Sequence, residues 1–223
     1  MTSRPEGPQR RDGSLSKERI VAEAIDILDS DGESGLTFRA LAARLATGSG
    51  AIYWHVANKS ELLSAAADDV VARATSVDIG DKSPRDAVRD VALGIFDAMN
   101  AHPWIGGQLS LEPWQPAITR ILEGMGGQLE ALGVPETRQF DAATALVSFI
   151  MGLAVQYATV ARILTRESDR TASLTTIADR WKQLDPDEYP FTNRMARHLP
   201  EHDDREQFLA GIDLILAGIV ATQ

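Results

Sequence analysis

The chain has 223 residues, of which 44% are hydrophobic, and this is enough to bury a core in one domain or in two. It contains no cysteine, which excludes disulfides and thiolate-rich metal sites and fits a cytoplasmic location. Residues 1–19 lack the apolar segment of a signal peptide, and no run of 18 apolar residues occurs, so we expect no membrane partner.

The formal net charge of −10 at first argues against a nucleic-acid partner, but the charge is unevenly distributed. Residues 1–68 hold 8 basic and 10 acidic residues, a net charge of −2, and the rest of the chain carries −8. A small basic surface in the first part can bind phosphates while the remainder repels them, so any affinity for DNA should depend strongly on salt.

In chain order, residues 1–14 lack apolar periodicity and are predicted to form a disordered arm. A helix is predicted from its N-cap Ser16 to the Asp31-Gly32 pair, where glycine supplies a left-handed end. Its apolar residues recur at spacings of three and four, as on one face of a helix: Ile20, Ala24, Ile27 and Leu28.

Two short helices then follow, joined by a glycine-containing turn, and this arrangement is typical of a helix-turn-helix. They are predicted at Thr37–Leu45 and Ser49–His55. Tyr53, Trp54 and His55 cannot all point inward from so short a helix, so some of these side chains must be exposed. Exposed aromatics with hydrogen-bonding tips suit contacts to phosphate, sugar and base methyl groups.

The following helix is predicted to begin at Asn58 with a capping box, in which Glu61 reaches back toward the start of the helix. Further on, Ser83 is an N-cap with Pro84 in the first turn, and a stretch rich in Pro, Trp and Gly interrupts the helices from His102 to Pro116. Apolar stripes predict the remaining helices at Ile118–Leu132, Phe140–Leu164, Ile177–Leu184 and Phe208–Val220.

No segment alternates with the period of a strand, so the predicted fold class is all-α. We divide the chain into a three-helix helix-turn-helix domain at residues 15–65 and a helical ligand-binding and dimerisation domain at residues 66–223.

Two stretches, Leu36–Ala42 and Gly50–Leu63, resemble the DNA-binding domain of the tetracycline repressor (TetR) family. The run Tyr-Trp-His-Val-x-Asn-Lys-x-x-Leu-Leu, which starts at Tyr53, is similar to that of the family's tetracycline-repressor branch. The resemblance covers about residues 16–65 and implies a homodimeric, ligand-responsive repressor that binds a palindromic operator in double-stranded DNA.

The resemblance also implies roles for single residues. Arg39 matches the position that bonds a guanine edge. The other matching positions fall into three groups, namely base reading by Ser49, Gly50 and Ala51, base-methyl and phosphate contacts by Tyr53, Trp54 and His55, and backbone anchoring by Thr37 and Lys59. The chain departs from the family pattern at Ala46-Thr47-Gly48-Ser49-Gly50, where small residues replace larger ones at positions that would read bases.

Alternatives remain open for several of these residues. Arg39 would be a surface charge in the simplest reading, and Trp54 would be a packing residue between helices. His55 would be exposed in either case.

The C-terminal part is long enough to enclose a ligand among its helices. Its candidate lining residues are polar or aromatic side chains within apolar stretches: His102, Trp104, Trp114, Gln156, Tyr157 and Trp181. A core role competes with ligand contact for His102 and for the tryptophans, and no metal or other cofactor is expected.

The dimer is predicted on the helices at Phe140–Leu164 and Phe208–Val220. Both are apolar over more than one face, so each requires a second partner.

Two other classes of function compete with the regulator. An all-α enzyme would need a positioned nucleophile, an acid–base pair or a metal cluster. His198 and His202 are four residues apart but straddle Pro200, and no phosphate-cradling glycine loop occurs. A helical small-molecule-binding protein without specific DNA binding is compatible with the altered turn.

Overall fold

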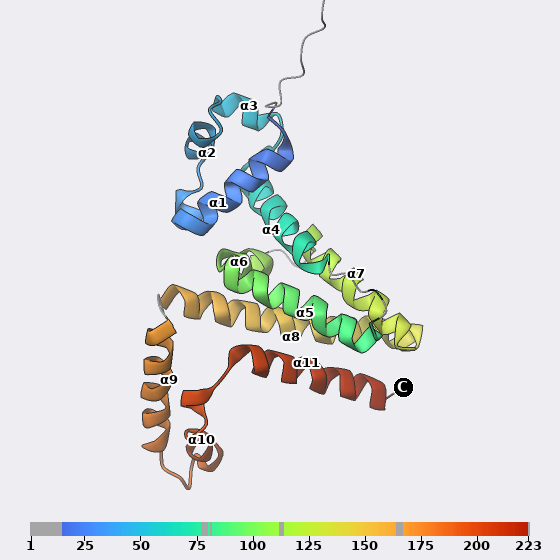
Figure 1. The fold of residues 1–223 in the computed structure, drawn as a ribbon, viewed down its shortest axis with the longest axis vertical. Coiled ribbons are helices and arrows are strands. Elements are labelled where there is room, and N and C mark those ends of the chain that lie inside the picture. Colours follow the sequence, from blue (N-terminus) through green and yellow to red (C-terminus); the bar gives the residue numbers. More distant parts are fainter. Residues whose placement is uncertain (1–14, 77–79, 81, 112–113, 164–166, 223) are drawn as a thin grey trace, which may run out of the picture. The chain divides into compact units, whose positions relative to one another are not determined.

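The computed structural model describes residues 15–76, 80, 82–111, 114–163 and 167–222, with the side chains of 154, 155, 157–163 and 167–169 left undescribed. This part of the chain is helical and contains no strand, as predicted (Figure 1). Its α-helices are α1 (Lys17–Gly35), α2 (Phe38–Arg44), α3 (Ser49–Tyr53), α4 (Lys59–Thr75), α5 (Pro84–Ala101), α6 (Trp104–Leu111), α7 (Pro116–Ala131), α8 (Glu136–Ile163), α9 (Glu167–Lys182), α10 (Pro190–Met195) and α11 (Asp204–Ala221), and a 3-10 turn, η1, spans Leu199–Glu201.

The chain forms two compact units, Met1–Ala66 and Ala67–Gln223, and α4 contributes residues to both. In the first unit, Ser16 caps α1 as predicted, because its hydroxyl accepts a hydrogen bond from the amide of Arg19 at 3.3 Å. The predicted apolar face of α1 is buried. Regular helical geometry breaks at Gly32, where φ is +69° as predicted, and a short second helical segment continues α1 to Gly35.

The second unit is built around α5, α7 and α8, with α6 and α11 packed against them. Phe208 of α11 is fully buried, and its ring lies 5.0 Å from that of Phe96 on α5 and 5.9 Å from that of Phe149 on α8. Gly211 makes this packing possible, since a Cβ atom there would collide with the ring of Phe149. The core of the unit therefore depends on close approach between α8 and α11.

Several predicted boundaries in the second unit were wrong. The stretch His102–Pro116 contains α6, because its prolines lie before and after residues 104–111, and the two glycines within α6 do not stop the helix. The helix predicted at Ile177–Leu184 is the longer α9, because the polar residues at its start do not form an apolar stripe. The helix predicted to begin at Phe140 is α8, which begins at Glu136, before its first large apolar residue. Ser83 and Pro84 begin α5 as predicted, and His198 and His202 flank η1 instead of sharing a helix.

No helix in the described residues is long and apolar enough to span a membrane.

Candidate nucleic-acid interface and effector domain

The turn between α2 and α3 orients the second helix of the predicted helix-turn-helix. α2 ends in a Schellman motif, in which the amide of Thr47 bonds the carbonyl of Ala42 at 2.9 Å and that of Ala46 bonds the carbonyl of Ala43 at 3.2 Å. Ala46 takes the left-handed conformation, with φ of +52°, that glycine adopts more readily. Gly48 follows with ordinary dihedrals and begins α3 without a side-chain cap.

At the start of α2, the hydroxyl of Thr37 accepts a hydrogen bond from the amide of Ala40 at 3.1 Å and thereby caps the helix. Arg39 stands in the first turn, and its side chain is exposed. It has no hydrogen bond or ion pair to another described residue, so its guanidinium is available to a partner.

The outward face of α3 carries two aromatic side chains. Ile52 is buried beneath the helix, whereas Tyr53 is 55% exposed and Trp54 is 90% exposed. The ring of Tyr53 meets that of Phe38 edge-on at a centroid distance of 4.5 Å, so Phe38 fixes its direction. Because Trp54 is 90% exposed, it does not pack between helices of this chain, and the alternative that it is a packing residue is wrong.

α3 is shorter than the predicted Ser49–His55. It ends at Tyr53, with Trp54 as its C-cap, and the amides of His55 and Val56 both donate to the carbonyl of Ile52 at 2.9 and 3.1 Å, which closes the helix. His55 lies beyond the helix and is half-buried, not exposed as expected. Ser49 is also half-buried, and its hydroxyl lies 3.5 Å from the carbonyl of Phe38, whereas Gly50 is exposed and Ala51 is half-buried.

The start of α4 follows directly after this segment. Asn58 accepts from the amide of Glu61 at 2.9 Å, as the capping box predicts. The carboxylate of Glu61 instead accepts from the amide of Ala57 at 2.8 Å, one residue before the expected partner, and it also pairs with Lys17 at 3.2 Å. These two contacts, the amide of Ala57 foremost, hold the pKa of Glu61 below its ordinary value of 4.5.

Lys59 projects from the first residue of α4 and donates to the carbonyl of Glu33 at 2.6 Å. A hollow of about 400 Å³ opens beside it, lined by Leu36, Thr37, Phe38, Tyr53, Ala57, Asn58, Lys59 and Leu62. The two predicted backbone anchors and Tyr53 therefore share one concave surface.

The six predicted ligand residues lie at several places in the second unit. His102 is the half-buried C-cap of α5, and its ring lies 6.2 Å from that of the half-buried Trp104. Trp181, on α9, uses its carbonyl to accept from Asn193 at 3.4 Å. Gln156 is exposed on α8, and the side chain of Tyr157 lies outside the described residues.

Trp114 is 80% exposed and lies at a groove of about 660 Å³ in the second unit. The groove is lined by Ala72, Thr75, Ser76, Trp114, Pro116, Thr119, Arg120, Glu123 and Gly124. Sequence analysis missed two buried polar side chains before this groove, Gln108 and Gln115, which are linked by a 3.0 Å hydrogen bond from the amide of the Gln115 side chain to the carbonyl of Gln108. Each of the two lies beside apolar residues in the sequence, and this is the signal from which its burial could have been predicted.

The C-terminal half of α4 is held firmly within the second unit. Arg120 of α7 bonds Asp68 through two nitrogens, each at 3.1 Å, and this carboxylate raises the pKa of Arg120. Gly94 of α5 lies directly against the carbonyl of Ala74, where a Cβ atom would collide. Because α4 also supplies Leu62 and Leu63 to the core of the first unit, it is the continuous element shared by both.

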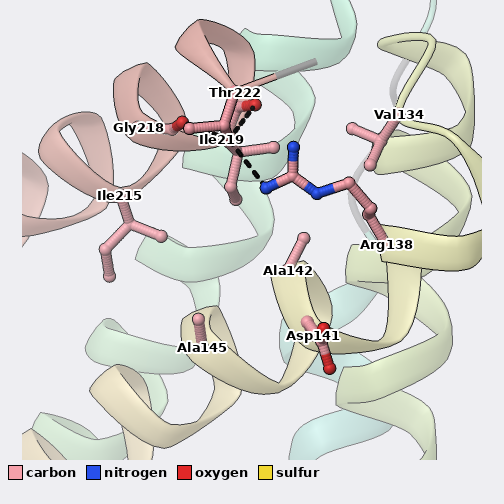
Figure 2. A pocket seen from close by; sticks show the side chains of 9 residues that line it. All are labelled: Val134, Arg138, Asp141, Ala142, Ala145, Ile215, Gly218, Ile219 and Thr222. Atoms are coloured by element: carbon pink, nitrogen blue, oxygen red, sulfur yellow. Dashed lines mark hydrogen bonds between the residues drawn. The ribbon is translucent and has the colours of Figure 1, made fainter.

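The helices α8 and α11 present an apolar groove of about 280 Å³ to the outside (Figure 2). Ala145, Ile215 and Ile219 line it, and Arg138 closes one end by a 2.8 Å hydrogen bond to the hydroxyl of Thr222. Leu214, on the outer face of α11, is 75% exposed. Among the described residues no group of three His, Asp or Glu side chains is placed to hold a metal ion.

Two family models match the chain. The model for bacterial regulatory proteins of the tetR family matches residues 20–66, and the model for the tetracyclin repressor-like C-terminal domain matches residues 78–223, more than half of the chain.

Individual relatives agree with this assignment. The transcriptional regulator SCO7222, a TetR from Streptomyces coelicolor, is 51% identical, with 93% of this chain and 99% of that chain covered and a TM-score of 0.84. BioQ of Mycobacterium smegmatis is 28% identical, with 94% and 100% covered and a TM-score of 0.66. The class D tetracycline repressor protein of Escherichia coli is 28% identical over 92% of this chain and 88% of its own length.

The family consists of transcriptional regulators, which sets aside the enzyme alternative. The chain belongs to the TetR family, and it is a DNA-binding transcriptional regulator of that family.

Proposed function

We propose that the protein is a cytoplasmic, homodimeric repressor that binds a palindromic operator through α2 and α3 and releases it when a small molecule binds to the second unit. The observation that carries this proposal is the exposure of Tyr53 and Trp54 at the end of α3 and of Arg39 on α2, whose side chain has no partner among the described residues. The relative BioQ has been solved with its natural double-stranded DNA operator, which supports the choice of partner.

In this proposal Arg39 bonds O6 and N7 of a guanine, because an exposed guanidinium that no other described residue engages matches that edge. Thr37 and Lys59 anchor the sugar-phosphate backbone from the rim of the hollow that they share with Tyr53. Ser49, Gly50 and Ala51 read base edges, and Tyr53, Trp54 and His55 contact base methyl groups and phosphates. Lys59 must exchange the carbonyl of Glu33 for a phosphate oxygen.

The dimer in this proposal forms through α8 and α11. The outer face of α8 carries only small side chains over two turns, at Ala145, Ser148 and Gly152, and Leu214 stands out from α11. Small residues permit close helix approach, and a two-fold axis would bury Leu214 against its copy or against the groove beside it. Paired recognition helices then require half-sites about 34–36 Å apart or somewhat more.

The effector in this proposal is a mostly apolar small molecule, larger than an amino acid, that binds within residues 80–185. The side chains predicted to meet it are aromatic and carry few charges, so a strongly charged ligand would be poorly compensated.

We place the boundary between the two functions within α4, with residues 15–65 for DNA and residues 66–223 for effector and dimer. Because α4 is anchored in both units, it is the element through which an effector would act on the reading helix.

The test is binding of the full chain to duplexes that it selects from a randomised pool, with single-residue variants. Arg39→Ala should weaken specific binding by about 1–3 kcal/mol and relax the preference at one base pair. Lys59→Ala should weaken binding to all duplex sequences alike. It should also lower, by about one, the slope of log affinity against log salt concentration. Arg194→Ala, which removes an exposed arginine from α10, is the matched control and should change neither.

If no duplex is enriched, the helical small-molecule-binding alternative replaces the repressor. The effector half of the proposal has its own test, in which a library of apolar compounds is screened by tryptophan fluorescence with and without the selected duplex. Linkage requires DNA to weaken effector binding by the same factor by which effector weakens DNA binding. If the affinity for an effector is the same with and without the duplex, induction through that site is excluded.

A further inference from the structure

The groove of about 660 Å³ beside Trp114 lies between one face of α4 and one face of α7 in the second unit. Its α4 face presents the small side chains of Ala72, Thr75 and Ser76. The hydroxyls of Thr75 and Ser76 donate to carbonyls of their own helix at 2.8 and 2.6 Å. This wall therefore offers a ligand carbon atoms and hydrogen-bond acceptors. The volume is typical of small-molecule sites, which take about 300–1,000 Å³.

Trp114 brings an aromatic surface to the groove. It precedes α7 by two residues and is 80% exposed, so most of its indole ring is open to solvent. Within the described part of the chain its ring meets no other aromatic ring. Trp54 is the other strongly exposed tryptophan, and the proposed function assigns that residue to DNA. The exposure of Trp114 has no such explanation.

The uncompensated charge of the groove is negative. Arg120 lines it but is neutralised by Asp68, to which it bonds through two nitrogens at 3.1 Å. Glu123 stands one turn later on the same face of α7, and its exposed side chain has no ion pair with another described residue. The surroundings are acidic as well, since the chain beyond residue 68 carries a net charge of −8. Local and overall charge both favour a cation over an anion.

We propose that this groove binds an aromatic molecule that carries a single ammonium group, with its ring stacked on Trp114 and its charge paired with Glu123. An exposed indole face attracts both aromatic rings and organic cations. One positive charge matches the one unpaired carboxylate, whereas an anion would be repelled by it and a second positive charge would have no partner in the lining.

The inference deepens the effector half of the proposed function and rests on that half alone. It gives the mostly apolar effector a single positive charge and a place against α4. Ala72 and Ser76 form one wall of the groove, so a ligand there touches the helix to which both units contribute.

The test compares two probes that share one ring system, the cation (2-naphthylmethyl)trimethylammonium and the neutral 2-naphthylmethanol. Calorimetry with the full chain measures their affinities. The indole N–H signals of the four tryptophans, recorded by NMR, show where each probe binds. Trp114→Phe identifies the signal of Trp114 by removing it.

The wild-type protein should bind the cation more tightly than the alcohol, and both probes should move the Trp114 signal. Glu123→Gln should weaken binding of the cation by about threefold to fivefold, the factor for an exposed ion pair, and leave binding of the alcohol unchanged. Trp114→Ala should weaken binding of both probes by about fivefold to tenfold. Glu130→Gln is the matched control, because it makes the same change at an exposed glutamate of α7 outside the groove, and it should alter neither affinity.

Both variants alter exposed side chains and should melt as the wild type does. Equal affinity of Glu123→Gln and wild type for the cation would overturn the inference, as would a cation that moves the signal of another tryptophan or binds with no saturation. None of these measurements contains DNA. Failure to select any duplex would remove the repressor, and the groove would then be the site of the helical small-molecule-binding alternative.

Discussion

The helices α2 and α7 end in the same backbone motif, but with different residues where the chain turns left-handed. At the end of α7, the amides of Gly133 and Val134 bond the carbonyls of Glu130 and Leu129 at 2.9 and 3.0 Å. The amides of Ala46 and Thr47 make the equivalent bonds at the end of α2. Both ends are Schellman motifs, one in each unit of the molecule.

The residues at the two ends are not equally suited to the motif. Gly133 reaches φ of +80° without a Cβ, whereas Ala46 holds φ of +52° with one, and a left-handed residue other than glycine costs about 1–2 kcal/mol. The motif also favours apolar residues on both sides of the turn, and α7 supplies the buried Leu129 and Val134. The turn that orients the reading helix is therefore the less stable one, as is common for elements that bind a partner.

The largest effect should come from removing the apolar support of the α7 end. Leu129 is fully buried, so Leu129→Ala should lower the free energy of unfolding by about 2–5 kcal/mol in a urea titration. Leu111→Ala, at a leucine that is 74% exposed, is the control and should change it by no more than about 0.5 kcal/mol. Equal effects of the two would mean that the α7 end contributes nothing special to stability.

A smaller loss is expected from placing at the α7 end the residue that α2 uses. Gly133→Ala should cost about 1 kcal/mol, because the Cβ has open space and only the backbone conformation opposes it. Gly127→Ala in the same helix should shift the urea midpoint the other way, since alanine favours a helix there. A neutral Gly133→Ala would show that the left-handed residue in this motif bears no strain.

The reverse change should stabilise the reading unit. Ala46→Gly should raise the protection of the Thr47 amide against hydrogen exchange by about 0.5–1 kcal/mol, because glycine adopts the same dihedrals without strain. Affinity for a selected duplex should not fall, as the turn keeps its conformation. Weaker protection in Ala46→Gly would mean that the strain at Ala46 is offset by a contact of its methyl group.

The sequence predicted the fold class and the helix-turn-helix because these depend on local signals. Ser16, Thr37 and Ser83 cap their helices as their types suggest, and Gly133 ends α7. The position of the left-handed residue at the α2 turn was not predictable, because Gly48 is the better candidate by type and Ala46 is held there by the hydrogen bonds of the motif.

The candidate site was only partly predictable for the same reason. The short length of α3 predicted that some of its aromatic side chains must be exposed. Which of these side chains are exposed depends on tertiary packing. Phe38 supports Tyr53, and the chain turns after α3 so that His55 is half-buried. The ligand residues were predicted from residue type alone, and residue type does not determine which helices face one another, so their contact with an effector stays a prediction.

The smallest effects concern the acidic residues at two helix starts, Glu61 at α4 and Asp203 at α11. The amide of Ala57 holds the pKa of Glu61 below its ordinary 4.5, and the amide of Glu206, at 2.8 Å, holds that of Asp203 below its ordinary 3.8. A carboxyl whose pKa is lowered by folding binds its proton less tightly in the native state. Its stabilisation is complete above the ordinary pKa and is lost as the pH falls through the lowered native value.

Acidification should therefore weaken both helix starts. The two carboxyls can be followed by NMR titration, together with the amides of Ala57 and Glu206 that they bind. Each midpoint should lie below the ordinary value of its group, and Glu61→Gln should abolish the titration of the Ala57 amide while leaving that of Glu206 intact. A Glu61 midpoint at or above 4.5 would show that its bonds to Ala57 and Lys17 do not persist in solution.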